Sequence, residues 1–371
     1  NRPYQETSSR VSGSEIISSN SKTSYNGNYG LNASWTLYNG NKRLKTIQQE
    51  KLNNQVAELD VATSENNIQE SIAQVYIQIL YAAESVKVNE STLQVSIAQR
   101  DRGQELLNAG SIAKSDFAQL EAQVSTDRYQ LVTAQATLED YKLQLKQLLE
   151  LDGENEMNIY LPALSDENVL APLPTKKDVY IRALSLRPEI EASKLNVEAS
   201  ELGIGIAKSS YLPTISLSAG IGTNHTSGSD FTFGEQVKNG WNNSIGLSVS
   251  VPIFNNRQTK SAVQKAKLQY ETSMLSLLDE QKTLYKTIEG LWLDANSAQQ
   301  RYAAANEKLK STQISYELIS EQFNLGMKNT IELLTEKNNL LQAQQEQLQA
   351  KYMAILNMQL LKFYQGDQLA I

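Results

Sequence analysis

Two carboxylates occupy equivalent positions in the two halves of this 371-residue chain. Asp116 lies six residues after Gly110, and Glu332 lies six residues after Gly326. Gly326 follows Gly110 by 216 positions, and Glu332 follows Asp116 by the same number. Acid–base catalysis by a carboxylate needs a positioned proton partner, and His225 is the only histidine of a chain without cysteine. The sequence also has no glycine-rich phosphate loop and no cluster at metal-ligand spacing. We therefore expect a protein that is not an enzyme and that holds no cofactor and no metal.

The same offset of 216 residues relates two long stretches of helical pattern. Between positions 68 and 93, apolar residues recur mostly in steps of three and four, which is typical of a helix seam packed against a partner helix. These residues are Ile68, Ile72, Val75, Ile79, Ala82, Val86 and Leu93, and 216 positions later stand Leu284, Ile288, Leu291, Ala295, Ala298, Tyr302 and Leu309. The constant offset predicts a duplicated unit of strand, long helix, glycine turn and returning helix, with repeats at 1–175 and 176–371.

Long helices dominate each repeat. We expect helices at 42–106, 114–149, 176–185, 188–209, 259–324 and 330–364, with a reversing turn at 103–111. The first would be roughly 65 residues and about 100 Å long, so other helices must pack along it. Residues 151–177 contain Pro162, Pro172 and Pro174, which predicts an irregular connector.

Alternating segments predict strands before each long helix. A weak strand is expected at 7–16, a loop at 18–28, and clearer strands at 29–37, 214–221 and 244–251, with a loop at 222–243 that includes His225. The faces opposite the apolar ones are small or hydroxylated. The candidate lipid-facing residues are Leu31, Ala33, Trp35, Ile215, Leu217, Ile221, Ile245, Leu247, Val249 and Val251.

These strands permit two interpretations. A small sheet on a soluble core would alternate in the same way, but the strands approach the ~9–11 residues that cross a bilayer when tilted. No run of eighteen apolar residues occurs, so a membrane role would rest on the strands. Since the smallest membrane barrels have about eight strands, four strands per chain would require several chains to share one barrel.

The sequence resembles the TolC-type outer-membrane efflux proteins, also called outer membrane factors, over essentially its whole length. The resemblance rests on the duplicated unit, on the order of its landmarks and on three short motifs. These motifs are Tyr211-Leu212-Pro213-Thr214, Ser250-Val251-Pro252-Ile253-Phe254, and Phe323-Asn324-Leu325-Gly326 followed by an acidic residue. It implies an α+β membrane protein whose long α-helical hairpins form a tunnel, the α-barrel, and whose four transmembrane β-strands per protomer join a trimeric twelve-stranded β-barrel.

The resemblance also implies location and partners. The protein would be a homotrimer in the outer membrane of a Gram-negative bacterium, surrounded by outer-membrane lipid, with its helical body in the periplasm. Its partners would be a periplasmic adaptor (membrane fusion) protein and an inner-membrane RND or ABC transporter. The net charge of −7 argues against nucleic-acid binding. Since 176–210 has no counterpart in the first repeat, we expect about 35 further residues before Asn1.

The resemblance assigns a pore constriction to the tips of the hairpins. Glu332 matches an acidic ring position and Lys328 a basic position of the gate, whereas Phe323 stands where the family has a tyrosine and cannot donate a hydroxyl hydrogen bond. Three copies of Glu332 or of Asp116 around a pore would attract cations. The alternative is that each carboxylate only complements the dipole of its own helix N-terminus.

The turns themselves are candidate docking surfaces for an adaptor, with ordinary helix capping as the alternative. Their residues are Leu107, Asn108, Ala109, Gly110, Ser111, Asn324, Leu325, Gly326 and Met327. The sequence thus predicts the passive outer-membrane exit duct of a tripartite efflux or type I secretion system, for drugs or polypeptide. A soluble periplasmic coiled-coil tether or adaptor protein is the alternative.

Overall fold

The computed structural model describes residues 7–12, 15–20, 25–151, 159–160, 169–227 and 230–369. The chain divides into two compact units. Unit 1 comprises Asn1–Leu52 and Val197–Thr272, and unit 2 comprises Asn53–Asn196 and Ser273–Ile371. Within the described ranges, no helix combines the length and apolar character needed to cross a membrane.

The helices repeat with the offset of 216 residues seen in the sequence. α1 (Lys42–Asn108) and α6 (Gln258–Asn324) have 67 residues each, and α2 (Lys114–Leu148) and α7 (Thr330–Tyr364) have 35 residues each. The first and last residues of each helix in the second hairpin lie 216 positions after those in the first. The shorter helices α3 (Lys176–Leu186) and α4 (Pro188–Ser209) also agree with the predicted positions.

The predicted turn at 103–111 is too long, because α1 continues through Gly103 to Asn108. Gly103 is buried, and a β-carbon there would lie 2.3 Å from Cδ1 of Leu120 in α2. This glycine therefore lets the two helices of the first hairpin approach closely.

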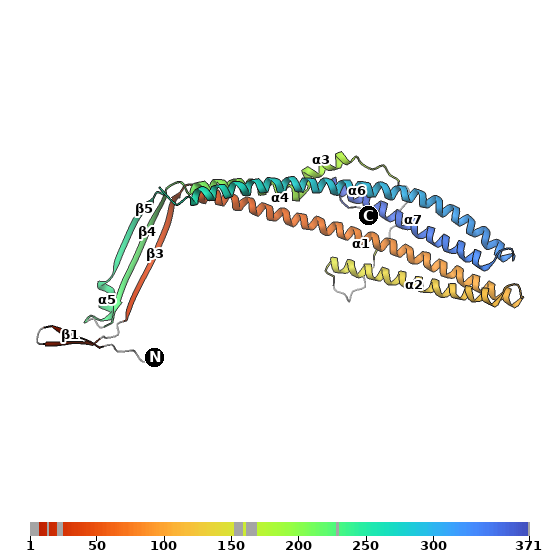
Figure 1. Cartoon of the computed structure of the whole chain (residues 1–371), viewed down its shortest axis with the longest axis horizontal. Coiled ribbons are helices and arrows are strands. Elements are labelled where there is room, and N and C mark those ends of the chain that lie inside the picture. Colours follow the sequence, from red (N-terminus) through yellow and green to blue (C-terminus); the bar gives the residue numbers. More distant parts are fainter. Residues whose placement is uncertain are drawn as a thin grey trace. The chain divides into compact units, whose positions relative to one another are not determined.

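Unit 1 contains the strands, and two of the predicted segments are corrected there. β1 (Thr7–Ser12) pairs antiparallel with β2 (Glu15–Asn20), so the single strand predicted at 7–16 and part of the loop predicted at 18–28 are wrong. The sequence Ser12-Gly13-Ser14 carries a turn signal that the one-strand interpretation overlooked. A separate sheet has the order β3-β4-β5, and its three strands lie side by side in Figure 1.

The three-stranded sheet is longer than predicted. β3 spans Asn26–Asn39, β4 spans Thr214–Thr226, and β5 spans Asn242–Ser250. The predicted loop at 222–243 is therefore partly wrong, since it contains the end of β4 with His225 and the short helix α5 (Phe233–Asn239). Thr232 caps α5 through a hydrogen bond from the backbone N–H of Glu235, which explains why a polar stretch forms a helix.

The register places the apolar side chains of all three strands on one face. Trp35 pairs with Leu217 and Leu217 pairs with Leu247, while the alternate rows consist of Ser, Thr, Asn and Gly. A bulge between Thr36 and Tyr38 changes the alternation, so Tyr38 rather than Leu37 faces Ile215 across the strands.

The core of unit 2 lies where the hairpins and α3 pack together. Ile77 and Leu80 of α1 pack with Tyr302 of α6 and Ile355 of α7 in one cluster. A second cluster joins Val179, Ala183 and Ile190 to α6 and α7. Burial of these stripes, rather than intrinsic helix propensity, stabilises helices of this length.

Candidate functional site

The two hairpin turns have the same backbone geometry. Gly110 and Gly326 both have φ of +73°, the left-handed conformation that favours glycine. The N–H of Ser111 donates to the carbonyl of Leu106, and the N–H of Met327 donates to the carbonyl of Gln322. The glycine N–H groups donate three residues back, to Leu107 and Phe323, which completes a Schellman cap in each turn. The turns lie at the same end of unit 2 (Figure 1).

Glu332 is held by two neighbours at the start of α7. Its Oε2 accepts a hydrogen bond from the N–H of Asn329 (3.2 Å), while Oδ1 of Asn329 accepts from the N–H of Glu332 (2.9 Å). Its Oε1 lies 2.5 Å from Nζ of Lys328. The hydrogen bond from Lys328, and then that from Asn329, hold the pKa of Glu332 below its usual value. The carboxylate is therefore a capping group that also stays ionised as the pH falls.

Asp116 occupies the equivalent place in α2 with fewer partners. Its Oδ2 accepts a hydrogen bond from the N–H of Ala113 (3.3 Å). Ala113 has no side-chain acceptor, so the reciprocal bond that Asn329 makes in the second hairpin has no counterpart at this cap. The two carboxylates thus share a position but differ in how firmly they are held.

The two other residues predicted at the gate differ in exposure. Phe323 is only 3% exposed and packs inside the tip of the second hairpin. Lys328 is partly exposed and is engaged with Glu332 of the same helix start. The lining of a pore by these four side chains stays a prediction.

The residues predicted to dock an adaptor are mostly exposed at the turns. Leu325 and Met327 are 69% and 70% exposed, and Asn108, Ala109, Gly110 and Ser111 are exposed as well. Ile331 in the first turn of α7 adds a further exposed apolar side chain that the sequence interpretation did not single out. Their role in docking stays a prediction.

A buried ionic cluster close to the tips was not predicted. Nζ of Lys337 in α7 contacts Asp127 of α2 and Ser96 of α1, and Ser96 also donates a hydrogen bond to Asp127. Gln123 donates to the other oxygen of the Asp127 carboxylate (2.9 Å). Asp127 fills the gap in the apolar stripe between Val124 and Leu131, and this charged residue at a seam position was the signal to look for.

A second unpredicted cluster surrounds Arg187 at the end of α3. The guanidinium lies 3.0 Å from Glu70 and 2.8 Å from Glu189, and its carbon lies 4.0 Å from the ring centre of Tyr364. Burial opposes the charge of Arg187, but Tyr364 and the two carboxylates outweigh that effect and raise its pKa. Burial, with a contribution from Glu70, raises the pKa of Tyr364 to about 12. The cluster ties α1, α3, α4 and α7 together.

In unit 1 the residues predicted to face lipid are brought together on the apolar face of the sheet. Ile245, Leu247 and Val249 are 84%, 66% and 60% exposed, and Leu31 and Trp35 are exposed too. Val251 lies just beyond the end of β5 and is also exposed. Adjoining apolar side chains that are exposed on one face of a sheet indicate a contact with a partner or with a membrane.

Among the described residues, no three His, Cys, Asp or Glu side chains are arranged to hold a metal ion. His225 pairs across the strands with Gly27, and its ring centre lies 5.0 Å from that of Phe233. It therefore packs within the sheet end rather than in a loop, which corrects the predicted position.

The family model for outer membrane efflux proteins matches residues 4–150 and 179–366. The outer membrane efflux protein BepC of Brucella suis is 24% identical over 290 residues, which cover 78% of this chain and 60% of that protein. The outer membrane protein TolC of Escherichia coli K12 is 23% identical over 311 residues, which cover 81% of this chain and 62% of that protein. The chain thus spans about three fifths of the length of these relatives.

A crystal structure of CusC has a similar fold, with a TM-score of 0.79 at 19% identity. The likeness covers 98% of this chain and 82% of that chain. The predicted fold class, with long helical hairpins and a β domain, is thereby confirmed.

Proposed function

Because the chain belongs to the outer membrane efflux protein family, we propose that it is the outer-membrane exit duct of a tripartite efflux or type I secretion system. Three copies assemble in the outer membrane of a Gram-negative bacterium, with the helical hairpins in the periplasm. The assembly conducts small molecules or polypeptide to the exterior passively and carries out no reaction of its own.

The observation that carries this proposal is the exposed apolar face of the β3-β4-β5 sheet. In the alternative, a soluble coiled-coil tether, this face would be covered by the protein's own interior, at a gain of ~25 cal/mol per Å² of buried apolar surface. Leu247 and Val249 are instead 66% and 60% exposed. A lipid environment accounts for apolar side chains outside and small hydroxylated ones on the other face.

The duplication supports an assembly of six similar hairpins. Helix bounds that repeat after 216 residues favour a division into repeats at 1–175 and 176–371, each contributing one hairpin. In this proposal the strands of the three copies form one closed sheet in the membrane, and the hairpins surround a tunnel.

The exposed hairpin turns are the proposed contact with a periplasmic adaptor protein, which would connect the duct to an inner-membrane RND or ABC transporter. Leu325 and Met327 offer apolar surface at the end of the second hairpin, and the first offers small residues such as Ala109. Charged substitution at Ala109 and Leu325 is expected to abolish adaptor binding without affecting assembly. Unchanged binding would overturn the docking role.

The carboxylates at the tips are the proposed charge filter of the duct. Lys328 and Asn329 hold the pKa of Glu332 below its usual value, so this carboxylate keeps its charge to lower pH than an ordinary glutamate. Three copies around the axis would attract cations and repel anions. Asp116 is the corresponding group of the first hairpin and lies at the same end of unit 2.

Two measurements test the proposed function together. The detergent-purified protein should form threefold symmetric particles, and it should give discrete ion conductance after insertion into planar bilayers. A monomer or dimer that remains in solution without detergent and does not conduct would instead support the tether.

A further inference from the structure

The three-stranded sheet of unit 1 carries no ionisable carboxylate or base, whereas the helix ends that adjoin it carry only positive charge. β3, β4 and β5 contain no Asp, Glu, Lys or Arg. Segments 36–49, 202–213 and 250–270 cover the junctions of these strands with α1, α4 and α6, and they contain eight bases and no acid. We call these eight bases the basic band: Lys42, Arg43, Lys45, Lys208, Arg257, Lys260, Lys265 and Lys267.

The three junctions lie at the same end of the sheet (Figure 1). Asn39, the last residue of β3, pairs with Thr214, the first residue of β4, and Thr214 pairs with Ser250, the last residue of β5. α1 and α4 are also in contact there, because Nζ of Lys45 donates to the carbonyl of Gly205 (3.4 Å). The eight bases therefore lie at one end of the sheet, within about three helical turns of the strand ends.

The bases of the band are exposed, and no carboxylate of the protein neutralises them. Lys45 is partly exposed and the other seven are exposed. Among the residues that the structure describes, none of the eight forms an ion pair. In a chain whose net charge is −7, eight positive charges without a carboxylate partner indicate an anionic ligand.

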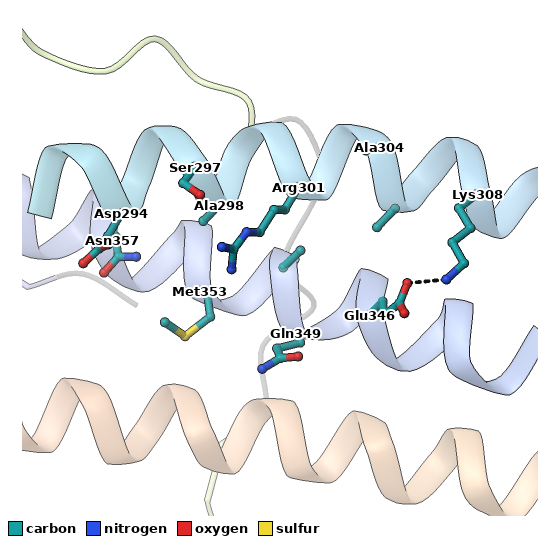
Figure 2. Close-up of a pocket in the computed structure, with 12 residues that line it drawn as sticks. Asp294, Ser297, Ala298, Arg301, Ala304, Lys308, Glu346, Gln349, Met353 and Asn357 are labelled. Atoms are coloured by element: carbon teal, nitrogen blue, oxygen red, sulfur yellow. Dashed lines mark hydrogen bonds and ion pairs between the residues drawn. The ribbon is translucent and has the colours of Figure 1, made fainter.

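The helical body of unit 2 shows the usual arrangement, in which bases stand beside acids. Nζ of Lys308 lies 2.6 Å from Glu346, and Figure 2 shows this ion pair between α6 and α7. Asp294 lines the same hollow as Arg301. The basic band therefore differs from the rest of α6 in its lack of acids, although both regions are rich in bases.

The starts of α1 and α6 also place positive charge where the helix itself opposes it. Each of the other five helices described has an acid in its first turn: Asp116, Asp178, Glu189, Glu235 and Glu332. α1 and α6 have none; Lys42 and Arg43 begin α1, and Lys260 lies in the first turn of α6. Because a helix N-terminus carries partial positive charge, these bases are unfavourable for their own helices. An anion bound from outside would offset that cost.

Exposed apolar side chains separate the bases from the sheet along the chain. Ile253 and Phe254, between β5 and Arg257, are 95% and 83% exposed, and Tyr211 and Leu212, between Lys208 and β4, are exposed as well. The apolar stems of lysine and arginine can lie along such surface while their charged ends reach polar groups. The junction thus fits the boundary between hydrocarbon and charged headgroups, whereas an aqueous duct would leave these apolar side chains in water.

We propose that the basic band binds the phosphate groups of anionic phospholipids, in the membrane leaflet that faces the periplasm. The inference rests on the proposed function and deepens it, because it names the lipid class at one end of the sheet. With the uncharged sheet in the hydrocarbon, the bases lie at the level of the lipid phosphates, and an anionic membrane surface attracts them. The other end of the sheet lacks this bias, because segments 1–25 and 227–241 each contain both acids and bases.

Lipid retention by the full chain tests the proposal. The protein, purified in detergent, is incubated with mixed micelles that contain equal amounts of phosphatidylglycerol and phosphatidylcholine, and is then isolated again. Mass spectrometry of the retained lipid should show an excess of phosphatidylglycerol, and added salt should reduce that excess because salt screens exposed charges. Equal retention of the two lipids at low salt would overturn the proposal.

A triple variant removes one base from each of the three junctions. Lys42→Gln, Lys208→Gln and Lys260→Gln together should lower the excess of phosphatidylglycerol several-fold, because each base near an anionic surface contributes to the attraction. The charge-conserving variant with arginine at the same three positions should keep the excess. Loss of the excess in the arginine variant, or its persistence in the glutamine variant, would contradict a role for the charge of the band.

The matched control removes three exposed lysines from the part of α6 in unit 2. Lys282→Gln, Lys286→Gln and Lys310→Gln change the net charge by the same amount and should leave the excess of phosphatidylglycerol unchanged. An equal loss in this control would show that only the total charge of the protein matters, and it would overturn the band as a binding surface.

Conductance of the same samples in planar bilayers separates this proposal from the proposed function. A conducting channel without preference for phosphatidylglycerol overturns the lipid contact and leaves the duct intact. A glutamine variant that becomes more cation-selective but retains the excess of phosphatidylglycerol would place the bases inside the duct and would also overturn the contact. A protein that neither assembles nor conducts removes the proposed function, and the lipid contact with it.

Discussion

The Nζ atom of Lys337 in α7 contacts the Asp127 carboxylate in α2, and the two side chains are 3% and 2% exposed. Burial lowers the pKa of Lys337, and the hydrogen bond that its ammonium donates to the Asp127 carboxylate opposes that shift. Because the unfolded chain binds this proton more tightly, Lys337 makes stability rise as the pH increases through its folded pKa toward the usual lysine value. The pair therefore joins two hairpins at an energetic cost that its contacts must offset.

Replacing only one member of this pair should be strongly destabilising. Lys337→Met leaves the Asp127 charge buried without its counter-ion, and we expect a loss of about 3–5 kcal/mol in the free energy of unfolding. Urea unfolding of the detergent-solubilised protein, followed by circular dichroism, measures the change.

The double variant Lys337→Met with Asp127→Leu provides the control. Removing both charges should leave stability close to that of the original chain or above it, since desolvation is no longer required. Additive losses in the two single variants and the double variant would show that the side chains do not act as a pair.

Lys328 should set the pH range over which Glu332 is charged. The pKa of Glu332 is held low first by the hydrogen bond from Lys328, so Lys328→Met should raise it. If Glu332 acts as the charge filter, block of the channel by a trivalent cation should then be lost at a higher pH than in the original protein. Single-channel currents recorded from neutral to acidic pH provide the measurement.

Glu332→Gln separates this role from helix capping. Glutamine can replace glutamate in a capping box but carries no charge. We expect cation block to disappear at every pH while the thermal unfolding midpoint changes little. Block that persists in this variant would mean that the carboxylate serves only the start of α7.

The turn glycines should respond to substitution through backbone conformation alone. A β-carbon at Gly326 would meet no atom within 4 Å, but φ is +73°. Gly326→Ala should cost about 1–2 kcal/mol, the penalty of the left-handed conformation. Gly326→Asn should cost less, because asparagine tolerates this conformation, and thermal unfolding of both variants tests the difference.

Gly103→Ala should be destabilising for a different reason. Alanine would add about 1 kcal/mol of helix propensity in α1, but its β-carbon would lie 2.3 Å from Cδ1 of the buried Leu120. Overpacking of this kind costs about 1–3 kcal/mol, so we expect a net loss. In a Leu120→Ala background, Gly103→Ala should cost less than it does in the original chain, and an equal cost in both backgrounds would argue against the clash.

Arg187→Lys should be far from conservative. Arg187 reaches Glu70 (3.0 Å) and Glu189 (2.8 Å) at once and stacks on Tyr364. An ammonium cannot keep all three contacts, so we expect a loss of about 2 kcal/mol, that of one charge-assisted hydrogen bond. Lys194→Arg, at an exposed pair with Glu191, is the control and should be neutral in the same unfolding assay.

The helical body could be predicted from the sequence because its signals are local. Apolar spacing, absence of proline and turn glycines placed α4 and α7 at their observed bounds and most other helix ends within two residues. The offset of 216 residues was visible without any structure, and the capping position of Glu332 followed from its distance to Gly326. The β segments were less certain, since the bulge at Thr36 and Tyr38 and the helix α5 depend on pairing and capping that alternation does not encode.

Only the tertiary structure decided which faces meet. Lys337 and Asp127 are 210 positions apart, and periodicity alone cannot show that two charged residues on separate helices bury each other. The repeats are equivalent in sequence pattern, yet α7 has sixteen buried residues and α2 has four. The difference arises because the burial of each helix depends on packing against segments that are distant in the sequence. Local pattern therefore determines where helices begin and end, while the partner of each helix face is a property of the folded chain.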